Sequence, residues 1–251
     1  MGKRVFLGVG HGGSDPGAVK FLREADANLV MALAAKEYLE ARGVIVGISR
    51  IRDEEDPLTE EIEEANAFSP DLAVEIHNNA GGGDGWEALI QTNGYAAKSK
   101  AAALAIEKEV KALGQQSRGL KTRLNSAGTD YFGFLRMVKA PAIIAEGFFV
   151  DNKADTADFD TKAEQQAMGC AYARGILAHL NIDDSVRAAK YPVKVKVTAT
   201  VLNIRKGPGT SHAVVGTIED QGVYTIMEES GGWGRLKSGA GWIFMAYTKK
   251  I

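Results

Sequence analysis

Short apolar runs alternate with longer amphipathic stretches through the first 180 residues, and this alternation constrains the fold more than any other feature. Apolar runs occupy residues 5–10, 44–49, 72–76, 86–92 and 142–145. Apolar residues recur at helical spacing over residues 22–42, 58–68, 96–113 and 161–180. Strands that alternate with helices in this way are typical of an α/β fold, so we expect a sheet covered by helices.

The pattern changes after residue 180. Residues 181–190 lose the apolar periodicity and are expected to form a linker. From residue 191 onward valine, threonine and glycine alternate, with turn signals at 207–209 and 231–232. This pattern is typical of a small all-β barrel, which needs roughly sixty residues. We therefore predict a first domain over 1–180 and a second domain over 191–251.

The charge of the chain bears on its partners. The net charge of −2 argues against nucleic acid as a partner. Residues 191–251 hold eight Lys and Arg against four Asp and Glu, a net charge of +4 that suits an anionic surface. No apolar run is long enough to span a membrane, and the run at 5–10 is too short for the core of a signal peptide. We expect no membrane insertion, and synthesis in the cytoplasm without a signal peptide.

A glycine-rich loop with a histidine at its centre follows the first apolar run. Residues 8–13 formally match the dinucleotide fingerprint G-x-G-x-x-G. Pro16 and Gly17 prolong the loop where that fingerprint needs a helix to begin, and Ser49 stands where its acidic residue is expected. The dinucleotide interpretation is therefore rejected, and the position of His11 at the end of a strand needs another explanation.

Three further polar residues are expected near His11. His77 follows the third apolar run, Glu146 follows the last one, and Glu24 begins the first helix. Ligands of open α/β sheets gather outside the carboxyl ends of the strands. Two histidines and a carboxylate form a common catalytic zinc set that leaves a position open for water. Simpler explanations also fit, since His77 suits a strand end and Glu24 suits the positive end of a helix.

Four segments resemble the amidase-3 family of zinc-dependent N-acetylmuramoyl-L-alanine amidases, which includes autolysins and phage endolysins. The first segment is the loop Gly-His-Gly-Gly-Ser-Asp-Pro-Gly at 10–17, and the second is Glu-Ala-Asp-Ala-Asn at 24–28. The others are Glu-Ile-His-Asn-Asn-Ala at 75–80 and Ala-Glu-Gly-Phe-Phe-Val-Asp-Asn at 145–152. They occur in the family's order. Glu75 and Asn78 depart from the small residues that the family has there.

This resemblance implies a fold, a reaction and a set of roles. The fold is a twisted mixed sheet flanked by helices. The reaction is cleavage of the amide bond between N-acetylmuramic acid and L-alanine in peptidoglycan. His11, Glu24 and His77 would hold one Zn²⁺ per chain, and Glu146 would be the catalytic glutamate that moves the proton. Arg136 is a candidate for binding a substrate carboxylate, although a structural ion pair explains it equally well.

The second domain resembles the bacterial SH3-like domains that many cell-wall hydrolases carry. The stretch Leu-Asn-Ile-Arg-Lys-Gly-Pro-Gly at 202–209 matches their signature, and Gly-Trp-Gly-Arg-Leu at 232–236 and Gly-Trp-Ile at 241–243 follow in order. Such domains recognise wall peptide or polymer. We expect Trp233, which follows a Gly-Gly turn, to be exposed and to contact the wall. For Trp242, packing in the barrel and contact with the wall both stay open.

Two other functions stay open at this point. One is a wall-binding protein whose hydrolase domain is inactive, and the other is a zinc peptidase that cuts within the stem peptide. The order of the domains and the expected lack of a signal peptide favour a phage or prophage endolysin that is released when a holin opens the membrane. An autolysin exported by another route is the alternative.

Overall fold

The computed structural model describes residues 2–185, 192–230 and 232–251. The chain divides into two compact units, Met1–Arg187 and Ala188–Ile251, and each is described here by itself. Half of the predicted linker, residues 186–190, lies outside the described residues, so the predicted domain bounds stay predictions. In the described part of the chain, none of the helices has both the length and the apolar character needed to cross a membrane.

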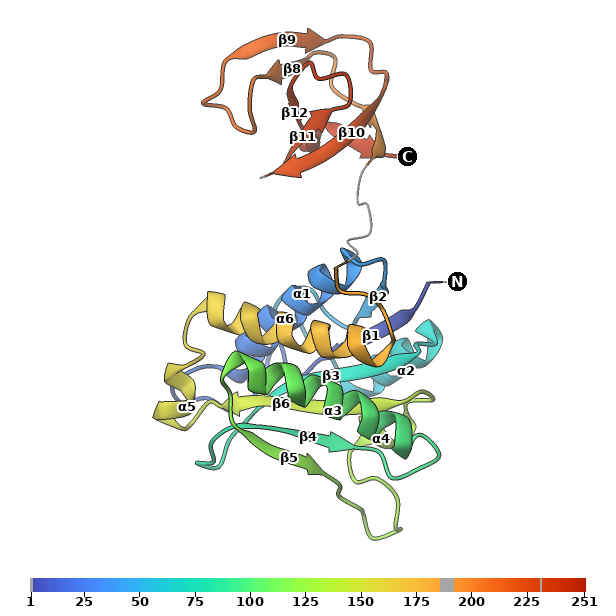
Figure 1. Ribbon diagram of the computed structural model, residues 1–251, viewed down its shortest axis with the longest axis vertical. Coiled ribbons are helices and arrows are strands. Elements are labelled where there is room, and N and C mark those ends of the chain that lie inside the picture. Colours follow the sequence, from blue (N-terminus) through green and yellow to red (C-terminus); the bar gives the residue numbers. More distant parts are fainter. Residues whose placement is uncertain (1, 186–191, 231) are drawn as a thin grey trace. The chain divides into compact units, whose positions relative to one another are not determined.

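The first unit is built on a six-stranded mixed sheet in the order β2-β1-β3-β6-β4-β5 (Figure 1). All neighbouring strands run parallel except β4 and β6, which pair antiparallel. This agrees with the mixed sheet that the resemblance implies. The strands are β1 (Arg4–Val9), β2 (Ile45–Ile48), β3 (Leu72–Asn79), β4 (Trp86–Ile90), β5 (Ser117–Lys121) and β6 (Ala142–Phe149).

Helices cover both faces of this sheet. One face packs against three long helices, α1 (Glu24–Glu40), α3 (Ala96–Leu113) and α6 (Lys162–His179). The other face packs against α2 (Leu58–Phe68) and α4 (Gly133–Met137), while the short α5 (Lys153–Ala157) follows β6. Both faces of the sheet are buried, and strand β1 shows this. Leu7 packs in the apolar core on the side of the three long helices, and Phe6 packs in the core on the side of α2 and α4. This is why the strands appear in the sequence as continuous apolar runs.

The helix bounds follow from local signals. Gly114, at a φ of 107°, ends α3 in the left-handed conformation that glycine adopts without strain. Thr161 and Glu164 form a capping box that begins α6, in which each side chain binds the other residue's backbone N–H.

Two strands are longer than predicted. Strand β3 runs on to Asn79 and β6 to Phe149, so His77 and Glu146 lie within their strands instead of after them. The predicted bounds stopped early because polar residues follow the apolar runs, and such residues resemble a loop. The prediction also omitted β5, α4 and α5, which are short and carry little apolar periodicity.

The second unit is all-β, as expected. Its seven strands form an antiparallel sheet in the order β13-β7-β10-β11-β12-β8-β9 around a separate apolar core. The elements are β7 (Val193–Val197), β8 (Leu202–Arg205), β9 (Val214–Ile218), β10 (Val223–Ser230), β11 (Trp233–Leu236), β12 (Trp242–Phe244), the 3₁₀ turn η1 (Met245–Tyr247) and β13 (Thr248–Lys250).

Candidate metal centre and active site

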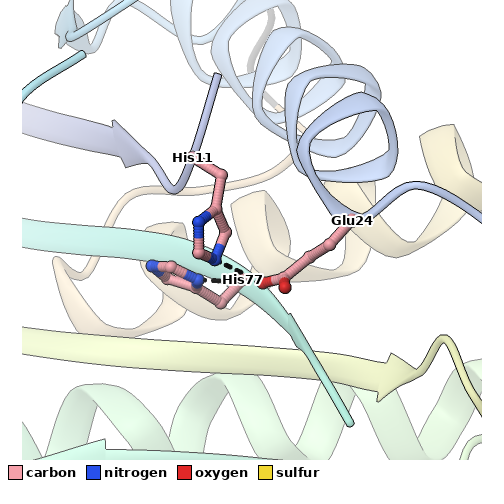
Figure 2. Close-up of side chains that lie close together, drawn as sticks. All are labelled: His11, Glu24 and His77. Atoms are coloured by element: carbon pink, nitrogen blue, oxygen red, sulfur yellow. Dashed lines mark hydrogen bonds and ion pairs between the residues drawn. The ribbon is translucent and has the colours of Figure 1, made fainter. Parts of the chain in front are cut away.

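His11, Glu24 and His77 converge on one point (Figure 2). His11 Nε2 lies 3.2 Å from Glu24 Oε1, and His77 Nδ1 lies 3.0 Å from the same oxygen. The two imidazole rings stand edge to face with their centroids 4.9 Å apart. One ligand atom from each residue lies within 4.8 Å of the others, so the group is able to hold a metal ion.

The loop before α1 places His11 by an unusual backbone conformation. His11 has a φ of 62°, in the left-handed region that is uncommon for residues other than glycine. Its Nδ1 lies 2.8 Å from Asp15 Oδ2, and this contact leaves Nε2 facing Glu24. Side chains at Gly10 and Gly17 would collide with the His77 ring and with His11, respectively. Glycine is therefore required at both positions by the close approach of the histidines.

Glu24 is the first residue of α1, and its side chain is only 5% exposed. Its Oε1 accepts a hydrogen bond from the backbone N–H of Asn78, and its Oε2 accepts one from Ala18. Burial opposes ionisation of this carboxyl, but hydrogen bonds from His11 and His77 hold its pKa well below the usual range. Glu24 is thus an ionised carboxylate at neutral pH, as a metal ligand must be.

His77 stands between two carboxylates. Its Nδ1 faces Glu24, and its Nε2 lies 3.6 Å from Oε1 of the buried Glu75. Burial alone would lower the pKa of His77, but the two carboxylates raise it well above the ordinary value. The cluster therefore attracts positive charge, which a proton or a cation supplies.

Glu146 lies beside this cluster on the neighbouring strand. It pairs in register with His77 of β3 and, on its other side, with Glu87 of β4. Burial raises the pKa of Glu146 to about 7, although the charge of His77 acts in the opposite direction. A carboxyl group with a pKa near neutrality is suited to both accepting and donating a proton.

A cavity of about 570 Å³ opens over these residues. Its wall includes all four, together with the acidic groups Asp56, Glu61 and Glu75. The segment Phe132–Phe134 at the start of α4 supplies an apolar side. None of the described residues that line the cavity is Lys or Arg, so the site is strongly acidic.

The structure describes the contacts of Arg136 and contradicts the expectation for Trp233. Arg136 Nη1 donates to the backbone oxygens of Asp130 and Tyr131, at 2.8 and 2.7 Å, and Arg136 is outside the set of described residues that line the cavity. The expectation that Trp233 is exposed is wrong: it is 8% exposed because its ring packs 5.1 Å from Phe244. Trp233 nevertheless lines a cavity of about 1030 Å³ in the second unit, beside Arg205 and Tyr247.

The sequence interpretation missed two residues next to the site. Glu87 Oε1 accepts a hydrogen bond from Asn79 at 3.0 Å, and its Oε2 lies 2.8 Å from Nε of Arg118. Arg118 belongs to β5, which was not predicted. Its contact with Glu87, the strand neighbour of Glu146, depends on strand pairing, and no local sequence pattern signals it.

Comparison with known proteins agrees with this geometry. Residues 5–178 match the family model described as N-acetylmuramoyl-L-alanine amidase. The chain belongs to this family. Residues 200–249 match the model of the bacterial SH3 domain, so the second unit belongs with those domains. Together these matches support a peptidoglycan amidase function.

Individual relatives align with most of this chain and over most of their own length. The N-acetylmuramoyl-L-alanine amidase CwlM of Bacillus licheniformis is 32% identical over 80% of this chain and 77% of its own length. An endolysin of Bacillus phage SPP1 is 33% identical over 72% of this chain and 68% of its own. Among solved structures, the catalytic domain of the amidase CwlV from Bacillus (Paenibacillus) polymyxa superposes with a TM-score of 0.64. That structure is 26% identical and covers 72% of this chain and 99% of its own.

Proposed function

We propose that the first unit is a zinc-dependent amidase that hydrolyses the bond between the lactyl group of N-acetylmuramic acid and the L-alanine of the stem peptide. The observation that carries this proposal is the convergence of His11, Glu24 and His77 beside Glu146, in an amidase family member. The acidic cavity over the four residues offers room for the reacting bond.

The donor set fits zinc. Two imidazole nitrogens and one carboxylate oxygen are the ligands of many catalytic zinc sites, which keep a further position open. Glu24 is held ionised by its partners, and the close contacts of both histidines with its Oε1 place three donors around one point. A Zn²⁺ ion held there would supply Lewis acidity, which activates water and polarises a carbonyl oxygen.

Glu146 moves the proton in this proposal. Its carboxylate accepts a proton from the attacking water as the new C–O bond forms at the lactyl carbonyl carbon. When the C–N bond breaks, Glu146 returns that proton to the alanine nitrogen. The products are a lactyl carboxylate and a peptide with a free amino-terminal alanine. A pKa raised by burial makes Glu146 able to perform both transfers near neutral pH.

An end-group assay on purified peptidoglycan tests this function, with and without a zinc chelator. New amino-terminal alanine without new reducing sugar, lost with chelator and restored by zinc, is the expected result. A different new amino terminus would identify a peptidase. Unchanged end groups with protein still bound to the wall would favour the inactive wall-binding protein.

The second unit is proposed to bind the wall through the cavity that Trp233 lines. Tyr247 forms an exposed part of this cavity, packs 5.8 Å from the Phe244 ring and is 52% exposed. Tyr247→Ala should therefore weaken binding to intact walls about fivefold and keep the unit folded, since stacking on a ring is worth about 1 kcal/mol. Val223→Ala, equally exposed but outside that cavity, is the matched control. Equal losses in both variants would refute the assignment.

Use as an endolysin is the proposed biological setting. A phage endolysin and a Bacillus amidase are both relatives at similar identity. Expression in the bacterial cytoplasm should leave cells intact until a holin is co-expressed, and lysis should then follow rapidly. Lysis without the holin would instead indicate export by another route, as for an autolysin.

A further inference from the structure

Four side chains form one row across the sheet. His77 on β3 pairs with Glu146 on β6, and Glu146 pairs with Glu87 on β4. Arg118 on β5 completes the row through its Nε, 2.8 Å from Glu87 Oε2. Since residues in register on adjacent strands point to the same face, the row leads from the proposed metal centre to the edge of the sheet.

A break in strand pairing positions Arg118. Strands β4 and β5 pair Trp86 with Ser117 and Ala88 with Leu120, so Glu87 faces the two residues Arg118 and Gly119. This is a β-bulge, a feature that often re-aims a side chain next to an active site. Gly119 has a φ of 77° although a side chain there would meet no neighbour. Its glycine therefore serves the backbone conformation of the bulge and not a close contact.

The guanidinium of Arg118 is held in place by only part of its hydrogen-bonding capacity. Its Nε binds Glu87, and the group lies 5.0 Å from the centre of the Phe149 ring. Its side chain is 42% exposed, and no hydrogen bond joins its two terminal nitrogens to any other described residue. Two parallel N–H groups free on the same edge are suited to a carboxylate.

The remainder of the site would repel such a carboxylate. The cavity is lined by acidic groups, with no Lys or Arg among its described residues, and Arg118 adjoins it through Glu87 and Asn79. Strands lie about 4.8 Å apart, so the backbone of β5 is roughly 10 Å from Glu146. A peptide advances about 3.4 Å per residue, so Arg118 lies about two to three residues from the reacting bond.

We propose that Arg118 is a specificity residue that binds a carboxylate on the stem-peptide residue following alanine. This inference rests on the proposed function, because it assumes that the amide next to alanine is cut. The carboxylate would pair with the terminal nitrogens of Arg118, while Glu87 and the Phe149 ring keep the guanidinium in place.

Two peptidoglycan preparations test this, differing only in whether that group is a free carboxylate or its primary amide. The initial rate of new amino-terminal alanine at low substrate measures kcat/KM on each. The wild type should cut the free-carboxylate wall about fivefold faster, as expected of one partly exposed charge-assisted pair. In Arg118→Gln this ratio should fall to about one, and Arg118→Lys should keep part of it.

The ratio of the rates on the two walls separates a direct contact with the substrate from indirect effects on the reaction. Loss of Arg118 also removes the partner of Glu87, whose negative charge acts on the neighbouring Glu146. Such an indirect effect would change the rates on both walls alike. Lys121→Gln is the control, since it removes the same charge from the same strand outside the row. A similar loss of preference in Lys121→Gln, or an unchanged ratio in Arg118→Gln, would overturn the inference, while new amino-terminal alanine would still support the amidase. If no new amino-terminal alanine formed on either wall, the proposed function itself would be overturned.

Discussion

His77 and Glu146 face each other in register on the parallel strands β3 and β6. The register fixes how a candidate metal ligand and a candidate proton carrier lie, because neither side chain depends on a loop for its position. Sites built on strands hold their geometry better than sites built on loops. The predictions below test each part of this arrangement.

Glu146→Gln should reduce the rate at which new amino-terminal alanine forms about 10²–10⁴-fold, the usual contribution of a general acid–base group. The amide keeps the size of the side chain, so the metal content should stay at one zinc per chain. Zinc analysis of the purified variant and the end-group assay measure the two effects. Retention of most of the activity would remove Glu146 from the mechanism.

The rate should rise with pH as Glu146 ionises, because only the carboxylate accepts a proton. Burial raises the pKa of Glu146 to about 7 without a metal, and a bound cation nearby would favour the ionised form. The midpoint of the acidic limb should therefore lie at or below pH 7. A profile of kcat/KM between about pH 5 and pH 8.5 measures it. A rate that falls as the pH rises through this window would contradict the role.

Zinc should stabilise the first unit alone. A ligand present at 1,000 times its Kd adds about 4 kcal/mol to the free energy of unfolding. Calorimetry with zinc and with chelator should thus show a shift in one transition, and His77→Ala should abolish that shift. The second unit has a separate core and serves as the internal control. Identical transitions under both conditions would argue against a metal ion at His11, Glu24 and His77.

Glu61→Gln should stabilise the first unit at alkaline pH. Glu61 is 3% exposed, its Oε1 has no hydrogen-bond partner, and burial together with nearby Glu75 raises its pKa well above 4.5. A raised pKa means that stability is fully present below the ordinary pKa and is lost as the pH rises towards the raised one. The variant cannot ionise, so it should gain roughly 1–3 kcal/mol over the wild type at high pH.

Denaturant unfolding at about pH 5 and pH 8.5 measures this difference, and comparing variant with wild type cancels the other titrating groups. Glu63→Gln, an exposed change on the same helix, should have no such effect. If the wild type and Glu61→Gln lose stability equally as the pH rises, Glu61 is not the group responsible.

Several parts of the fold could be predicted from the sequence. The helices over 58–68 and 96–113 are confirmed residue for residue as α2 and α3, because their apolar spacing marks them clearly; in the structure a residue in the left-handed conformation follows each of them. Strand β5 was missed because its sequence Ser-Arg-Gly-Leu-Lys has little apolar character at the edge of a sheet.

The candidate site could likewise be predicted only in part from the sequence. His11 and Glu24 could be placed together because the loop and the helix start are close in sequence, and His77 joins them as expected. Arg118 could not be predicted, since its position depends on which strands pair and on a bulge between them. Trp233 was misjudged because a Gly-Gly turn indicates the surface, whereas the ring folds back against Phe244.

The apolar cores of the two units share no residue among those described. Each unit therefore has its own source of stability, and one can lose its structure while the other keeps it. Under the proposed function, a molecule starved of zinc would then cease to cut yet still occupy its sites on the wall. Such molecules would compete with active ones for the same surface, so zinc supply would set both the number of working enzymes and the number of blockers.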